Sequence, residues 1–172
     1  MKDFIKKEVA FERVIFFSDA INIAGFWRTH HNAFFYINKM DDRMMFFNIG
    51  WLFLIVTLPF ATTLVSAHFG EPPAIFLYSM NVFGLSILQN SIWDYADTRN
   101  YIDKEKLPDL LGTRFRLVFN LDMINSLVCV ILSFFFPTVA FIFLFFKLPM
   151  WLFVAFYMAG KRKSHSPKPP VT

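Results

Sequence analysis

The chain has 172 residues, of which 56% are hydrophobic and 20% aromatic, and it carries a formal net charge of +4. A soluble domain of this size cannot bury that much apolar surface, so the composition excludes an ordinary soluble protein and predicts an integral membrane protein. The basic excess lies between the apolar runs and in the tail. That distribution suits anionic lipid, and no nucleic-acid partner is expected.

The first apolar stretch covers about residues 9–27 and is short for a membrane span. A helix needs about 20 mostly apolar residues to cross the hydrocarbon core. This stretch also contains Glu12, Arg13 and Asp19. Lysines precede it, as in a secretory signal peptide, but its internal charges and the lack of a small-x-small cleavage pattern predict that it is retained.

Longer apolar runs follow along the chain. Residues 44–67 contain no charged side chain, and Pro59 predicts a kink within them. The stretch from residue 117 to residue 160 is too long for one span, and Pro137 near its middle predicts two helices joined by a tight turn. The expected spans lie at about residues 9–27, 44–67, 74–93, 117–136 and 138–159.

These spans predict an all-α integral membrane protein with a single transmembrane domain over residues 1–160. Residues 161–172 are basic and rich in proline, and we expect them to form a disordered cytoplasmic tail. Cys129 is the only cysteine and lies within a predicted span, so it is expected to be a buried structural thiol without an intrachain disulfide.

The basic residues predict the orientation of the chain. Residues 28–43 hold three lysines and arginines and residues 99–116 hold five, so both loops and the basic tail are expected in the cytoplasm. The turn at residues 68–73 has no lysine or arginine and is expected outside. The N-terminal segment is also basic, which places both termini in the cytoplasm. The N-terminal segment and the loop at residues 28–43 are then both cytoplasmic, which requires an even number of membrane crossings between them. Residues 9–27 have room for only one crossing, and this is a parity conflict.

The sequence predicts neither an enzyme nor a cofactor site. It contains no G-x-S-x-G, no phosphate-binding glycine loop and no H-E-x-x-H motif. A chain with few acidic outside loops and no disulfide fits a bacterial inner membrane.

The first apolar segment carries a recognisable motif. Arg13, Phe17, Ser18 and Asp19 stand as R-x-x-x-F-S-D. This arrangement resembles the signature of the transmembrane protein 175 family of potassium channels. Arg13 and Asp19 are six residues apart, about 600° around a helix, so they point in different directions and each needs its own partner.

Further residues extend the resemblance. Trp27, His30 and His31 in F-W-R-T-H-H-N-A-F-F resemble the end of the family's second helix, and Asn48 and Pro59 resemble its third. We expect Trp27, His30, His31 and Asn48 to be the cross-helix partners of a polar network on the pore helix. Adjacent histidines point about 100° apart, which suits two separate hydrogen bonds better than one metal ion, so no metal is expected.

The resemblance implies a function and an assembly. Bacterial subunits of this family have six helices with both termini in the cytoplasm, and four subunits surround one pore lined by the first helix. For this chain we expect a bundle of about five to six transmembrane helices. A homotetrameric, leak-type cation channel with a modest preference for potassium over sodium is therefore implied, with potassium as the permeant ion and no cofactor. The sequence has no T-V-G-Y-G, so a ring of apolar side chains is expected in place of a carbonyl filter.

One departure from the family affects the pore. The family continues after Phe-Ser-Asp-Ala-Ile through the rest of the first helix and an outside loop, whereas this chain passes directly from Ile21 to Asn22. The loss of one helical hairpin would explain both the short first segment and the parity conflict. Ala24 stands where the family has a bulky aliphatic residue, so no constriction residue is assigned.

Three alternatives follow from the residues. In the first, Arg13 extends to the headgroups and Asp19 lies near water, so that no network exists. In the second, the chain is a non-conducting, shortened relative that keeps the scaffold without the pore. In the third, it is a small transporter subunit, for which Asp122, Asn125 and Lys147 are the candidate pocket residues.

Overall fold

The computed structural model describes residues 2–144, and this part of the chain is built from helices. The predicted all-helical class is confirmed for these residues. The helices are α1 (Lys2–Phe34), α2 (Asp42–Ala67), α3 (Pro72–Thr98), α4 (Asp109–Phe135) and α5 (Pro137–Leu144). The span expected at residues 138–159 is described only as far as Leu144, and Lys147 and the predicted tail lie outside the described residues.

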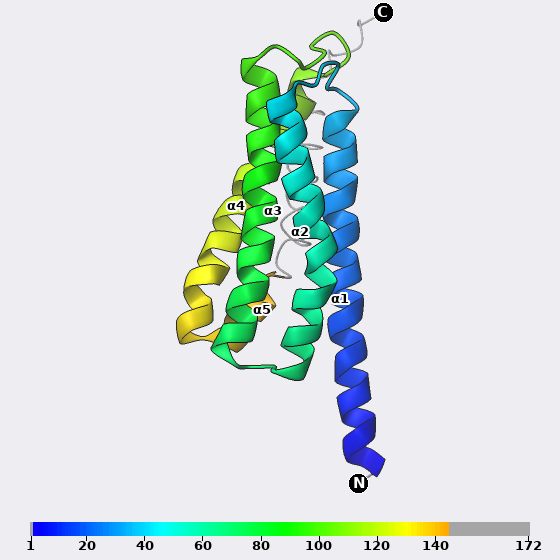
Figure 1. Ribbon diagram of the computed structural model, residues 1–172, viewed down its shortest axis with the longest axis vertical. Coiled ribbons are helices and arrows are strands. Elements are labelled where there is room, and N and C mark those ends of the chain that lie inside the picture. The colour runs from blue at the N-terminus through cyan, green and yellow to red at the C-terminus, as the bar shows by residue number, and fades with distance from the viewer. Residues whose placement is uncertain (1, 145–172) are drawn as a thin grey trace, which may run out of the picture.

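Helices α2, α3 and α4 are each long and apolar enough to cross a membrane. They lie side by side with alternating direction, and α1 lies along α2 (Figure 1). The N-terminal part of α1 extends beyond the end of α2 (Figure 1). The loops α1–α2 and α3–α4 meet at one end of the bundle, here called the basic end, and the start of α1 lies at the other (Figure 1). The basic N-terminal segment and the basic α1–α2 loop therefore lie at opposite ends of the bundle, so the parity conflict seen in the sequence remains.

Helix α1 has no interruption where the sequence departs from the family pattern. Residues 20–25 are helical and lie well inside the helix, which runs without a break from Lys2 to Phe34. The direct passage from Ile21 to Asn22 thus gives one continuous helix of 33 residues.

Local sequence signals set the ends of the other helices. Asp41 is the N-cap of α2, and its side chain accepts a hydrogen bond from the backbone N–H of Met44 at 2.9 Å. Gly70 adopts φ 86° in the turn before α3, a conformation that favours glycine. Helices α3 and α5 begin at Pro72 and Pro137, where the missing N–H of proline costs nothing. Helix α2 continues through Pro59.

The core is centred on α3, which packs against both α2 and α4, and one close contact between α2 and α3 depends on a glycine. The largest fully buried side chains of the core include Trp51, Leu58 and Val65 of α2 with Ile75, Tyr78, Val82, Leu85 and Ile92 of α3. A Cβ atom at Gly84 would lie 2.7 Å from Cδ1 of Leu54, so a larger residue there would push this leucine aside. Cys129 is buried, as predicted.

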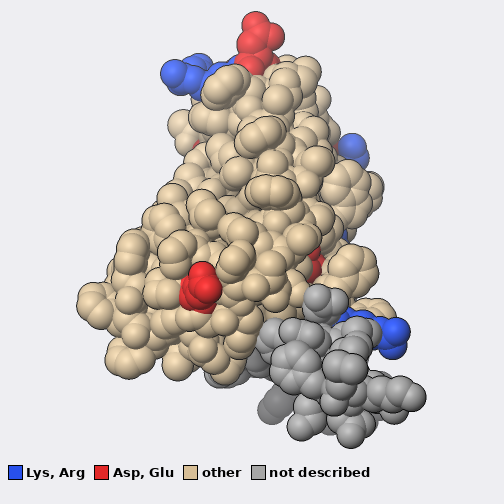
Figure 2. Space-filling view, turned by 60° about the horizontal axis from the view of Figure 1, so that its bottom comes forward, with Lys and Arg blue, Asp and Glu red and all other residues tan. Residues whose placement is uncertain are grey.

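The outside of the bundle is apolar. On α2 a stripe of exposed large side chains recurs every three or four residues: Phe46, Ile49, Phe53, Val56 and Phe60. Figure 2 shows that charged side chains are few over the face that it displays. Such a surface suits lipid or neighbouring subunits.

Candidate functional site

Helix α1 has one face against the bundle and one face free of it. The buried side chains recur every three or four residues, as expected for one side of a helix. They are Ile15, Asp19, Asn22, Phe26, His30 and Ala33. Three of these six residues are polar, so half of these buried side chains can form hydrogen bonds.

The motif aspartate is bonded to a tyrosine of α3. The hydroxyl of Tyr78 donates to Oδ1 of Asp19 at 3.0 Å, and Nδ2 of Asn22 donates to the same hydroxyl oxygen at 3.4 Å. Tyr78 is only 1% exposed and Asp19 only 4%. Thr62 of α2 is a further hydrogen-bond partner of the Asp19 side chain, so the cluster joins α1 to both α2 and α3. These partners of Asp19 differ from those that the sequence suggests.

His30 joins α1 to two helices at once. Its ring stacks on that of Trp51 of α2, with centroids 3.9 Å apart and planes 7° from parallel. Its Nδ1 lies 3.3 Å from Oε1 of Gln89 of α3, so this nitrogen carries the proton when the amide oxygen accepts. Asn48 of α2 lies beside the same ring. Trp27 is 53% exposed, and its ring centroid lies 6.3 Å from that of Trp51.

The opposite face of α1 is apolar in its middle. Phe17 is 66% exposed and Ile21 is 47% exposed, and Ala24 is exposed one turn further on. Arg13 and His31, both exposed, lie on the same face near its two ends. Ser18 lies in α1, but its side chain is outside the described part of the structure.

The structure therefore separates the predicted site residues into two groups. Asp19, His30 and Asn48 belong to the inward contacts, although Asp19 and His30 are in different clusters. Arg13, Phe17 and His31 face outward. Sequence reasoning missed Tyr78 and Gln89, the α3 partners. The available signal was a polar residue inside an apolar span, because such a residue needs a partner on a neighbouring helix.

We expect the bond between Asp19 and Tyr78 to contribute measurably to stability. Asp19→Ala leaves a buried hydroxyl proton without its acceptor, which costs about 1–3 kcal/mol of unfolding free energy. Tyr78→Phe removes the same bond, so the double variant should lose less stability than the sum of the two single variants. Unfolding in detergent measures this coupling, and strictly additive losses would contradict it.

At the basic end, the two loops are joined to each other. Ile37 and Ile102 form an isolated antiparallel bridge, and the N–H of Asp103 donates to the carbonyl of Tyr36 at 2.8 Å. Oδ2 of Asp41 accepts the hydroxyls of Tyr95 at 2.6 Å and Tyr101 at 3.2 Å. The hydroxyl of Tyr95 is the largest cause of the lowered pKa of Asp41. These contacts fix the α1–α2 loop against α3.

Asp103 of the α3–α4 loop has a pKa lowered to about 2. The main cause is the Lys106 side chain, whose Nζ lies 2.9 Å from Oδ2 of Asp103. An aspartate in an unfolded chain has a pKa of about 3.9, so the folded state favours the ionised form. The stabilisation is therefore complete above about pH 4 and is lost as the pH falls towards about 2.

Asp103→Asn should lower the melting temperature at neutral pH. The difference from the parent protein should shrink as the pH falls from about 5 to about 2, because protonation removes the charge of Asp103 in the parent protein as well. Melting curves across this range measure the effect. Glu105→Gln, which leaves the Asp103 contacts in place, is the control, and a difference that stays constant with pH would refute the assignment.

Comparison with known proteins tests the resemblance directly. Residues 3–59, which hold most of α1 and the first part of α2, match the family described as the endosomal/lysosomal potassium channel TMEM175. The resemblance to the TMEM175 family is confirmed. The matched range includes the R-x-x-x-F-S-D motif, Trp27, His30, His31 and Asn48.

Two curated relatives of this chain are named as ion channels and not as enzymes. One is a potassium channel of a Chryseobacterium species, 23% identical over 138 residues, which are 77% of this chain and 67% of that relative. The other is the endosomal/lysosomal proton channel TMEM175 of Rattus norvegicus, 26% identical over 92 residues, or 54% of this chain. The second match covers only 18% of the rat protein. No solved structure matches the chain. The relatives and the apolar helices identify a membrane protein related to ion channels.

Proposed function

We propose that this chain is the subunit of a homotetrameric, potassium-selective leak channel in a bacterial inner membrane. One observation carries the proposal: α1 turns Asp19, Asn22 and His30 into its own subunit and leaves an apolar face uncovered. A pore helix needs this division, because its polar contacts fix its position while its free face borders the ion path.

The free face of α1 supplies a candidate constriction. Four copies of α1 around a common axis would bring Phe17 and Ile21, the large apolar residues of this face, close to the axis. A ring of apolar side chains gates by controlling wetting and strips part of the hydration shell of an ion. Potassium is less strongly hydrated than sodium and loses less in passing, so the preference for potassium is modest. No cofactor is needed.

The basic end of the bundle is placed in the cytoplasm, because lysine and arginine are enriched in cytoplasmic loops. The proposal assigns no part of the ion path to the inward polar clusters, whose residues are engaged across helices. Arg13 and Arg28 flank the apolar segment of α1. The free face between them, with Phe17, Ile21 and Ala24, is uncharged.

The function is tested by ion flux through the purified protein reconstituted in liposomes. The proposal predicts a potassium flux that exceeds the sodium flux, measured beside a proton flux because one relative is named a proton channel. A proton flux without potassium flux would replace the proposed permeant ion. An assembled tetramer that passes no ion would instead identify a non-conducting, shortened relative.

A further inference from the structure

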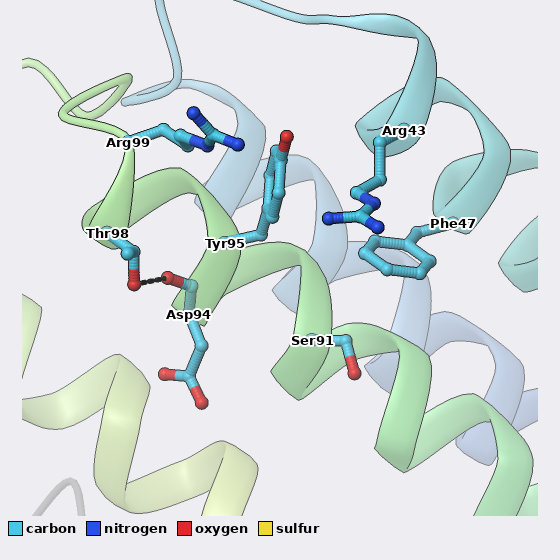
Figure 3. Close-up of a pocket in the computed structure, with 7 residues that line it drawn as sticks. All are labelled: Arg43, Phe47, Ser91, Asp94, Tyr95, Thr98 and Arg99. Atoms are coloured by element: carbon cyan, nitrogen blue, oxygen red, sulfur yellow. Dashed lines mark hydrogen bonds between the residues drawn. The ribbon is translucent and has the colours of Figure 1, made fainter.

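An open groove of about 590 Å³ lies at the basic end, between the first turns of α2 and the last turns of α3. Figure 3 shows the side chains that line it. They are Arg43, Phe47, Ser91, Asp94, Tyr95, Thr98 and Arg99. The groove combines two cations with aromatic and hydroxyl side chains, and it is separate from the free face of α1.

The positive charge of this groove is not cancelled by its own aspartate. The carboxylate of Asp94 points away from both Arg43 and Arg99 (Figure 3), and its Oδ1 lies 3.9 Å from Nη2 of Arg116 on α4. Arg116 also binds Asp97, at 2.7 Å. Among the described side chains, neither Arg43 nor Arg99 lies within 4.0 Å of a carboxylate oxygen, although Arg99 interacts electrostatically with Asp41 over a longer distance. The groove therefore presents two guanidinium groups to an external anion.

The two arginines are set on opposite sides of one aromatic ring. Tyr95 stands between Arg43 and Arg99 (Figure 3), and the Arg99 guanidinium carbon lies 5.5 Å from the centre of its ring. The hydroxyl of Tyr95 donates to Asp41 at 2.6 Å, so the outer end of the ring is held in place. The carboxylate of Asp41 is itself engaged by two tyrosine hydroxyls and a backbone N–H. This support keeps the two guanidinium groups apart and accessible.

We propose that this groove binds the phosphate of an anionic phospholipid in the cytoplasmic leaflet. Guanidinium groups bind phosphate oxygens in a bidentate manner, and basic pockets between transmembrane helices at the cytoplasmic side hold anionic headgroups. Phe47 lines the groove, and its chain neighbour Phe46 begins the exposed apolar stripe of α2, where Phe46, Ile49 and Phe53 are 73%, 57% and 66% exposed. An acyl chain can lie along this stripe while the phosphate of the same lipid occupies the groove. A free phosphate ion has no acyl chain and cannot make this second contact.

The proposal is tested on the full-length protein in phosphatidylcholine micelles, by its melting temperature as phosphatidylglycerol is added. We expect phosphatidylglycerol to raise the melting temperature of the parent protein. Arg43→Gln combined with Arg99→Gln should lose at least half of this rise. Lys39→Gln combined with Arg114→Gln removes the same charge from the same end outside the groove and should keep the rise. The readout needs no ion flux, so it is independent of the proposed channel function.

Each other outcome would overturn the proposal. An equal rise in the parent protein and the groove variant would show that the lipid binds elsewhere, and an equal loss in both double variants would show only diffuse attraction to charge. Inorganic phosphate that reproduces the rise at the same concentration would identify a phosphate site in place of a lipid site. If the double groove variant does not fold, Arg43→Gln alone leaves the contact between Arg99 and Tyr95 intact and is measured in its place.

Discussion

Replacing Phe17 with alanine is expected to raise potassium flux about tenfold and to reduce the preference over sodium. In the proposed channel, Phe17 is the largest residue on the free face of α1, with two-thirds of its side chain exposed in the subunit. A smaller side chain widens the apolar ring and makes it easier to wet. A barrier lowered by about 1.4 kcal/mol corresponds to about tenfold in rate.

Phe46 of α2 provides a matched control for Phe17. It is also an exposed phenylalanine, 73% against 66%, but it lies on the stripe assigned to lipid. Phe46→Ala should leave the flux of potassium and sodium unchanged. Both fluxes are measured in liposomes at equal protein content, and similar effects of the two substitutions would argue against a pore lined by α1.

Replacing Trp51 with alanine is expected to destabilise the protein by about 3 kcal/mol. Trp51 is completely buried and provides the surface on which His30 stacks, so its loss leaves a cavity and removes a contact between α1 and α2. In a membrane, packing of this kind is a main source of helix association. Because α1 contacts its neighbours through few large residues, α1 should also become more sensitive to proteolysis.

Two other substitutions define the contribution of Trp51. Trp51→Phe keeps an aromatic ring beside His30 and should recover part of the stability. Trp27 is half-exposed, so Trp27→Ala should cost clearly less than Trp51→Ala. Unfolding in detergent measures all three variants, and equal losses at positions 27 and 51 would mean that stacking on His30 does not hold α1.

The sequence predicted the helical class because long apolar runs have few other solutions in a membrane. The R-x-x-x-F-S-D motif also predicted that α1 carries functional residues, and this stays a prediction. The two faces of α1 were harder to assign, because polar residues on a membrane helix can turn towards partners or towards water. Asp19 and Phe17 are two residues apart, and only the packing of α3 shows that Asp19 faces Tyr78 while Phe17 is free.

Contacts at the basic end could not be predicted from local patterns. Asp41 is recognisable as an N-cap before the apolar run of α2, but its tyrosine partners lie 54 and 60 residues away. The groove between Arg43 and Arg99 depends on the same long-range pairing of α2 and α3. The charge pattern showed that this end is basic, and the structure shows which carboxylates are already engaged.

The most direct test of the central claim is the accessibility of single cysteines on α1 during ion flux. Cys129 is the only native cysteine, so Cys129→Ala gives a background in which Phe17→Cys, Ala24→Cys and Phe46→Cys can each be treated with a charged, water-soluble thiol reagent. If α1 lines the pore, modification at positions 17 and 24 blocks potassium flux and treatment at position 46 does not. Full flux after complete modification at positions 17 and 24 would contradict a pore lined by α1.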